Sequence, residues 1–226
     1  MKAFLVSFSG LDGAGKTTQV TNLRAHLGAR GLKTSLLTFW DNVVVLSRYR
    51  EGFVHKVFKS ERGIGAPDKP VKRRDKNVRG WHVNFARHGL YLLDAVNLRR
   101  VVASARNSGV DVVIMDRYIH DELANLSLEN PLTQWFVKLA ASIAPKPEVA
   151  FMLDTNPDAA RARKPEYPLD FLIDSRRRYQ RLAPMVGMTV IPPLPLEAAR
   201  LAVEKAFENN WNSKQRQIEQ EKVSAA

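Results

Sequence analysis

A glycine-rich segment follows a short apolar run near the start of the chain. Residues 10–18 read GLDGAGKTT and come after AFLVSF at residues 3–8. The segment fits the phosphate-binding pattern G-x-x-x-x-G-K-[ST]. In a strand, glycine turn and helix, backbone N–H groups and the positive end of the helix point at phosphate oxygens. The pattern predicts nucleotide contacts from Gly10, Gly13, Ala14, Gly15, Lys16, Thr17 and Thr18. A turn that only joins two elements is the alternative.

Three side chains have predicted roles in binding the phosphates of ATP and Mg²⁺. In this pattern Lys16 lies at the β- and γ-phosphates, and the hydroxyl of Thr17 binds Mg²⁺. Further along, the apolar run VVIM at residues 112–115 ends in Asp116. A carboxylate at the end of a strand beside the glycine loop can hold the water ligands of Mg²⁺. The sequence therefore predicts ATP and Mg²⁺ as cofactors, with the metal held by Thr17 and Asp116.

Arg117 follows directly after the predicted metal-binding carboxylate. Its guanidinium could contact an acceptor phosphate or the phosphoryl group in transfer, because five fixed donors suit phosphate oxygens. The alternative is an ion pair with a neighbouring acid such as Asp121 or Glu122. We therefore keep Arg117 as a candidate catalytic and acceptor-binding residue.

Strand-like and helix-like segments alternate along the chain. Continuous apolar runs predict buried strands, and stretches with helical spacing separate them. The predicted strands are 3–8, 34–39, 110–115, 149–153 and 189–191. The predicted helices are 16–30, 43–60, 81–107, 133–144 and 196–209, and residues 211–226 either extend the last helix or are disordered. This order indicates an α/β fold whose parallel sheet is covered on both faces.

The composition agrees with a single cytoplasmic domain. The 226 residues are 45% hydrophobic and include no cysteine, which excludes disulfides and thiolate metal sites. The apolar run before the glycine loop is too short for a signal peptide, and no apolar run reaches the length of a membrane span. We expect a P-loop domain over residues 1–209 and a polar tail over residues 210–226.

The chain is strongly basic, with a net charge of +12 and a pI near 10.1, which favours anionic partners. Lys and Arg are frequent in residues 61–80, where Gly and Pro predict a loop insertion. This segment could instead bind nucleic acid or an acidic protein, with the glycine loop acting as a nucleotide-dependent switch. Aromatic residues are not interleaved in the basic run 69–79, so stacking on bases has little support.

Three segments carry a resemblance: FSGLDGAGKTTQ at residues 8–19, DRY at 116–118 and PEVAFMLDTNPDAARAR at 147–163. With these segments the chain resembles the thymidylate kinase family of P-loop nucleoside-monophosphate kinases. The resemblance implies a three-layer fold with five parallel strands in the order 2-3-1-4-5 and a lid over about residues 156–168. It also implies a homodimer that transfers a phosphoryl group from ATP to a nucleoside monophosphate, with dTMP as the first expected acceptor.

The resemblance also assigns residues in the loop and the lid. Asp12 falls near the acceptor sugar or its phosphate. Family members without a basic residue inside the glycine loop supply positive charge from the lid, and this loop lacks one. Arg161 and Arg163 fall on lid positions, so they are the candidates for stabilising the transferred phosphoryl group. A solvent-exposed helix face is the alternative for these arginines.

The acceptor side departs from the family pattern. FWDN at residues 39–42 replaces the family's Arg-Glu-Pro segment after the second strand. Asp94 stands where the family has the Arg that binds the acceptor's phosphate. Arg87 or Arg48 could take over that contact. A nucleoside or another small acceptor is therefore the alternative substrate.

Two acidic residues on the acceptor side each have two interpretations. Asp41 could accept the proton of an acceptor hydroxyl, or it could cap a helix. Asp94 could bind a sugar hydroxyl, or it could pair with Arg87 or a lysine. The candidate acceptor-binding residues are therefore Asp12, Asp41, Arg87, Asp94 and Arg117.

Overall fold

The structure, a computed structural model, describes residues 2–45 and 81–224, and it describes side chains in the second range from residue 87 onward. The predicted basic insertion at 61–80 lies outside these residues. Arg48 and most of the predicted helix at 43–60 also lie outside them.

Five parallel strands form one sheet: β1 (Phe4–Gly10), β2 (Thr34–Thr38), β3 (Val112–Asp116), β4 (Val149–Leu153) and β5 (Thr189–Ile191). Their order is β2-β3-β1-β4-β5, which confirms the predicted α/β fold and strand order. β1 and β4 are buried along their full length. Continuous apolar runs suit such strands because helices cover the sheet on both faces.

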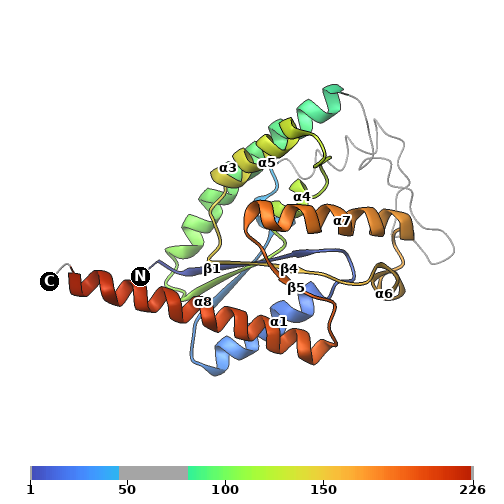
Figure 1. Cartoon of the computed structure of the whole chain (residues 1–226). Helices are drawn as coiled ribbons and strands as arrows, with labels where there is room; N and C mark the ends of the chain where they lie inside the picture. Colours follow the sequence, from blue (N-terminus) through green and yellow to red (C-terminus); the bar gives the residue numbers. More distant parts are fainter. Residues whose placement is uncertain (1, 46–80, 225–226) are drawn as a thin grey trace.

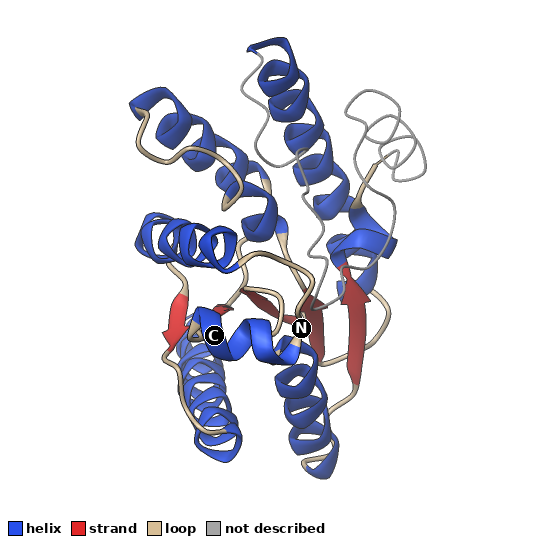
Figure 2. Cartoon of the chain, turned by 90° about the vertical axis from the view of Figure 1, so that its right-hand side faces the viewer, coloured by secondary structure: helices blue, strands red, loops and turns tan. Residues whose placement is uncertain are grey.

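The helices form two layers around the sheet, as Figures 1 and 2 show. One face carries α3 (Trp81–Arg106), α4 (Ile119–Leu123), α5 (Pro131–Ile143) and α7 (Leu169–Val186), and the other carries α1 (Lys16–Ala29) and α8 (Leu196–Ser224). Successive strand residues enter opposite cores: Leu5 and Met115 face the first layer, and Val6 and Ile114 face the second. The sheet is therefore the middle of three layers.

Local signals set several helix ends. The side chains of Asn130 and Asn156 cap α5 and α6 (Pro157–Arg163), and each accepts a 2.9 Å hydrogen bond from the N–H two residues on. Proline occupies the start of both helices, where its missing N–H costs nothing. Gly31 and Gly109 follow α1 and α3 with φ of 74° and 75°, as expected for helix C-terminal glycines.

The polar tail continues α8 as far as Ser224, so helical extension is the correct one of the two alternatives for residues 211–224. Trp211 contacts Phe4 of β1, with 5.3 Å between ring centroids. Lys214 pairs with Glu148, just before β4. These contacts hold α8 against the amino-terminal edge of the sheet.

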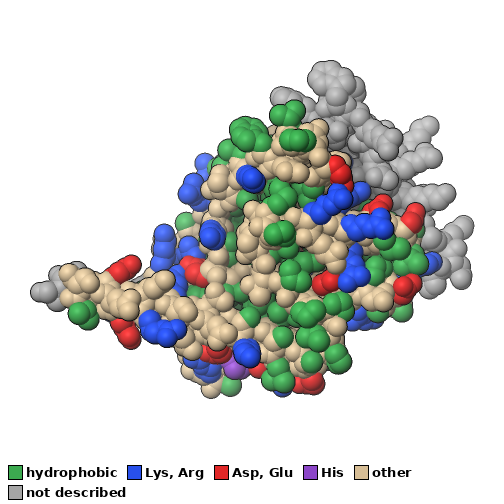
Figure 3. Space-filling view, viewed as in Figure 1, with side chains coloured by type: hydrophobic (Ala, Val, Ile, Leu, Met, Phe, Trp, Pro, Cys, Tyr) green, Lys and Arg blue, Asp and Glu red, His purple; other side chains and the backbone are tan. Residues whose placement is uncertain are grey.

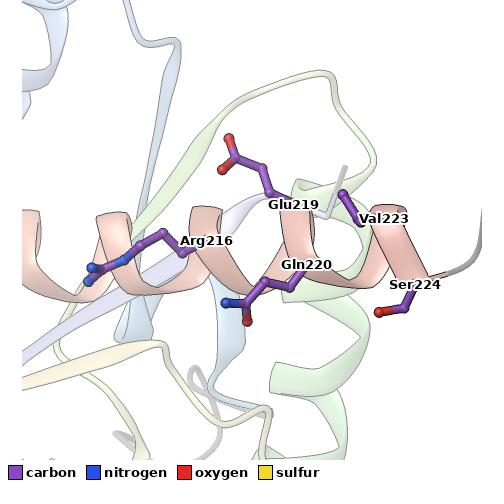
Figure 4. A pocket seen from close by; sticks show the side chains of 5 residues that line it. All are labelled: Arg216, Glu219, Gln220, Val223 and Ser224. Carbon is purple, nitrogen blue, oxygen red and sulfur yellow. The ribbon is translucent and has the colours of Figure 1, made fainter.

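The hollow in Figure 4 lies on the exposed end of α8. All five residues that line it, Arg216, Glu219, Gln220, Val223 and Ser224, come from this one helix. In Figure 1 this end of α8 lies beside the N-terminus of the chain, whereas the glycine loop follows the carboxyl end of β1. Among the helices of the described ranges, none combines the length and apolar character that a membrane span needs.

Candidate active site

The glycine loop lies at the carboxyl edge of the sheet, between β1 and α1. Gly10 and Gly13 have φ of 141° and 82°, values that residues with a side chain rarely adopt. A Cβ at Gly10 would lie 2.5 Å from the carbonyl oxygen of Leu153, and a Cβ at Gly13 would lie 2.5 Å from that of Ala160. The two glycines therefore let the loop pack closely against the end of β4 and against α6.

Gly13→Ala is expected to distort the loop or displace α6, because the added methyl would meet the backbone of Ala160 at 2.5 Å. The positive φ adds strain, and we expect a loss of about 1–3 kcal/mol in unfolding free energy. The Kd for Mg-ATP should rise about tenfold or more, as loop amides leave the phosphates. Thermal unfolding and calorimetric titration measure both effects. Gly28→Ala is the control, since its Cβ would meet nothing within 4 Å; equal losses in both variants would contradict the prediction.

Lys16 folds back over the glycine loop. Its Nζ donates hydrogen bonds of 2.8 Å to the carbonyl oxygens of Gly10 and Leu11, and the residue is 6% exposed. Burial, with a smaller contribution from the nearby Arg117, lowers the pKa of Lys16 to about 8. An ammonium group has three donors, so one proton remains for a phosphate oxygen.

Thr17 and Asp116 meet beside the loop, as the predicted metal site requires. The Thr17 hydroxyl donates to Oδ2 of Asp116 at 3.2 Å. The parallel register places Asp116 beside Phe8 of β1 and Thr38 of β2, so its carboxylate emerges at the same edge as the loop. A hydroxyl and one carboxylate suit Mg²⁺, which keeps several waters and takes its remaining ligands from phosphates.

Arg117 has a left-handed backbone with φ of 68°, the one positive φ among the described non-glycine residues. Its guanidinium pairs with Asp12 of the loop and lies 3.6 Å from Oδ1 of Asp121. Burial acts to lower the pKa of Arg117, but Asp121 and Asp12 outweigh it and raise the pKa above its usual value. The predicted ion pair with Asp121 is present, and Asp12 is a second partner. The backbone strain, of order 1–3 kcal/mol, aims this side chain at the loop.

Asp121 was predicted only as a partner of Arg117, yet it joins three elements under the loop. Oδ2 accepts from the Ser9 hydroxyl at 2.7 Å and from the Tyr118 N–H at 3.1 Å, and Oδ1 accepts from the Tyr179 hydroxyl at 2.8 Å. Burial and the Asp121 charge raise the pKa of Tyr179 well above its usual value, so it stays a donor. The one local signal for this role is the acid three residues after Tyr118, where it completes a capping box at the start of α4.

The predicted lid region contains α6, which follows β4 and packs on the loop at Gly13. Arg163 donates to the Thr155 hydroxyl at 2.8 Å and to the carbonyl of Ala159 at 3.1 Å. Arg161 is half-buried, and within the described part of the chain its side chain makes no hydrogen bond or ion pair. The structure therefore brings both arginines to the helix beside the loop, with Arg161 uncommitted.

The acceptor-side acids lie in different environments. Asp41 is exposed within η1 (Phe39–Val43), a π-helical turn directly after β2. The N-cap of this turn is Thr38, so Asp41 does not cap η1. Asp94 is fully buried on α3 and accepts a 2.9 Å hydrogen bond from the Val45 N–H. Arg87 is half-buried on the same helix.

Basic side chains are dispersed on the visible surface. On the face drawn in Figure 3, Lys and Arg lie among acidic and apolar side chains and form no continuous stripe in the described residues. Among the described residues several arginines pair with acids, for example Arg176, which holds Asp154 directly after β4 with bonds of 2.7 and 2.8 Å. This face therefore lacks the charge pattern expected of a nucleic-acid groove.

Comparisons with known proteins point to one family. The chain is 28% identical to the probable thymidylate kinase of Archaeoglobus fulgidus over 218 residues, which cover 93% of this chain and 97% of the relative. It is 30% identical to the thymidylate kinase of Bifidobacterium longum over 170 residues, 72% of either chain. The probable thymidylate kinase of Pyrococcus abyssi is 26% identical over 156 residues, 68% of this chain and 66% of the relative. The chain matches no protein-family model.

Proposed function

Because the chain belongs to the thymidylate kinase family, we propose that it transfers the γ-phosphoryl group of ATP to dTMP, forming dTDP and ADP. The observation that carries the proposal is the 3.2 Å contact between the Thr17 hydroxyl and the Asp116 carboxylate, next to the loop that holds Lys16. This arrangement supplies an anion site and a cation site side by side at one edge of the sheet. Phosphoryl transfer needs both, because catalysis is mostly positioning and charge stabilisation.

The donor nucleotide would bind over the glycine loop. Backbone N–H groups of the loop would hold the β- and γ-phosphates, and Lys16 would turn its remaining donor to them. Thr17 and Asp116 would hold Mg²⁺, which neutralises phosphate charge when bound. Arg117 would face the acceptor from its position beside Asp12. Each of these residues would hold its charge or hydrogen-bond donor in place before the reaction begins, so that little reorganisation is needed in the transition state.

Arg161→Ala is expected to lower kcat by about 10²- to 10³-fold while changing the KM for ATP less than about threefold. The loop carries no cation between Gly10 and Lys16, so a lid arginine would balance the charge on the transferred phosphoryl group. Steady-state ADP release measures both constants. The control is Arg177→Ala, an exposed arginine on α7 that pairs with Asp174. A kcat for Arg161→Ala within threefold of the wild type would exclude Arg161 from this role.

A nucleoside is the second candidate acceptor. It is favoured by the carboxylates on the acceptor side: Asp94 replaces the family's phosphate-binding Arg, and Asp41 is exposed at the end of β2. With a neutral hydroxyl acceptor, Asp41 would accept the proton as the O–P bond forms. With dTMP, the acceptor oxygen is already anionic and needs no base. Arg117 or Arg87 would then hold the acceptor's phosphate.

One assay distinguishes the two acceptors. ADP release from Mg-ATP is measured with dTMP, other nucleoside monophosphates, thymidine and other nucleosides, with Lys16→Ala as the blank. Turnover confined to dTMP supports the first proposal. Turnover with a nucleoside that Asp41→Ala abolishes supports the second. Hydrolysis of ATP without any acceptor would contradict both and would favour a nucleotide-dependent switch.

The lowered pKa of Lys16 predicts a pH dependence of ATP binding. The ammonium form is lost as pH rises through about 8, because burial disfavours the charge. Only this form pairs with phosphate, so the Kd for Mg-ATP should rise about tenfold between pH 7 and pH 9, with proton uptake on binding at the higher pH. Isothermal calorimetry in two buffers measures both quantities. Lys16→Arg should remove the pH dependence, and a wild-type Kd that stays constant across this range would contradict the prediction.

A further inference from the structure

The π-helical turn η1 separates buried from exposed side chains over five residues. Phe39 and Val43, four residues apart, are buried in the core, with exposed fractions of 0% and 1%. Trp40 is 46% exposed, and its ring meets Phe39 edge to face at 6.2 Å. Asn42 is occupied locally, because its side chain accepts from the Thr38 N–H at 2.8 Å. The turn therefore presents Trp40 and Asp41 to solvent from a fixed base.

Two side chains of α3 hold the backbone where the chain leaves this turn. Asp94 accepts a hydrogen bond from the Val45 N–H at 2.9 Å, and Asn97 donates to the Val43 carbonyl at 2.7 Å. They stand one helical turn apart, so they contact the segment from the same side. A buried carboxylate that binds backbone is unavailable to solvent, since Asp94 is 0% exposed. Asp94 thus holds the backbone of the turn through its bond with Val45.

The strand order decides which part of the site the turn faces. β3 and β2 lie on one side of β1, and β4 lies on the other side with α6 and the lid arginines. Thr38, the residue before η1, is in register with Asp116. The donor loop and lid therefore occupy the β1 and β4 side, and the β3 and β2 side is left for the acceptor. Trp40 lies on that side, two residues beyond the level of the metal-site carboxylate.

We propose that Trp40 is a specificity-determining residue that stacks on the planar ring of the acceptor, and that Asp94 and Asn97 are the positioning residues that fix it. This inference rests on the proposed function for its acceptor site. An exposed indole on a braced turn offers a rigid stacking surface at low entropic cost. The chemical class of acceptor is thus a compound with a flat base, whether or not it carries a phosphate.

Equilibrium binding to the full-length chain tests the stacking part. Calorimetry with dTMP and with thymidine is carried out for the wild type, Trp40→Phe and Trp40→Ala. Deoxyribose 5-phosphate serves as the ligand without a base. The reference ligand is whichever of dTMP and thymidine binds the wild type more tightly. We expect Trp40→Ala to raise its Kd about tenfold and Trp40→Phe to retain most of the affinity. The Kd of deoxyribose 5-phosphate should stay unchanged. An unchanged Kd in Trp40→Ala, or a wild type that binds neither base-containing ligand, would overturn the inference.

Hydrogen exchange tests the positioning part without any turnover. Asp94→Ala and Asn97→Ala should speed amide exchange at residues 43–45 and weaken base binding about as much as Trp40→Ala. Asp94→Asn keeps an oxygen acceptor for the Val45 N–H, so it should restore slow exchange and tight binding. Arg100→Ala, exposed on α3, is the control. If Asp94→Asn is as damaging as Asp94→Ala, the charge itself is used and the positioning role is overturned. Ligand binding without phosphoryl transfer would refute the proposed function while leaving this inference intact.

Discussion

Lys16→Ala is expected to lower kcat/KM for phosphoryl transfer by about 10³-fold or more. In the proposed function Lys16 would be the cation that the glycine loop brings to the phosphates, and its two bonds to loop carbonyls fix its direction. In a water-poor site such a charge stabilises the transition state far more than it would in bulk water. The same substitution removes a buried ammonium group whose lowered pKa reflects an unfavourable environment. Activity should therefore collapse while the fold does not lose stability.

The measurement for Lys16→Ala combines steady-state ADP release with thermal unfolding. The matched control is Lys33→Ala, an exposed lysine just before β2, which should change neither quantity. A Tm at or above the wild-type value, together with lost turnover, identifies a defect in the chemical step or in nucleotide binding. Turnover within tenfold of the wild type would rule out Lys16 as the phosphate-binding cation.

Asp121→Ala is expected to have the largest effect on stability, about 3–5 kcal/mol in unfolding free energy. The substitution leaves the Ser9 hydroxyl, the Tyr179 hydroxyl and the Tyr118 N–H without their shared acceptor in the core. Each buried donor that loses its partner costs about 1–3 kcal/mol, and partial rearrangement keeps the total below the sum. Arg117 also loses one of two acidic neighbours. The site and the core should therefore weaken together.

For a chain of this length, that loss corresponds to a fall in Tm of roughly 10 °C. Differential scanning calorimetry measures it, and ADP release shows whether kcat falls as Arg117 loses support. Asp174→Ala is the comparison, because this acid is exposed on α7 and pairs only at the surface with Arg177. Asp121→Asn keeps the shape but replaces one acceptor with a donor, so it should lie between the wild type and Asp121→Ala. A Tm change below about 2 °C in Asp121→Ala would contradict a stabilising role for the hydrogen bonds that Asp121 accepts.

The glycine loop, the parallel sheet and the bounds of α1, α3 and α5 could be predicted because their signals are local, whereas α4, α6 and α7 were not among the predicted helices. A positive φ strongly favours glycine, and a continuous apolar run must be covered on both faces. The contact between Thr17 and Asp116 was also predictable, since parallel strands of one sheet end at the same edge. The strand order came from the resemblance and is confirmed. The homodimer stays a prediction.

The roles of buried polar residues could not be predicted in the same way. Asp94 was predicted to bind either a sugar hydroxyl or a cationic side chain. Its hydrogen bond with the Val45 N–H depends on how α3 crosses the end of β2. Asp41 is a residue type that often caps helices, but the N-cap of η1 is Thr38. The tail had no periodic signal strong enough to decide between helix and disorder, and the contacts of Trp211 and Lys214 with the sheet edge decided it.

The sequence alone thus determined the class of fold, the donor loop and the likeness to one kinase family, because dihedral limits and apolar patterning act within a few residues. Only the tertiary structure decided which acids contact solvent, backbone or other side chains. Asp121 shows the reason: its partners Ser9 and Tyr179 are 112 and 58 residues away along the chain. Hydrogen-bond donors from the elements that surround a buried charge compensate the cost of burying it. Which elements surround it depends on tertiary packing and not on local sequence.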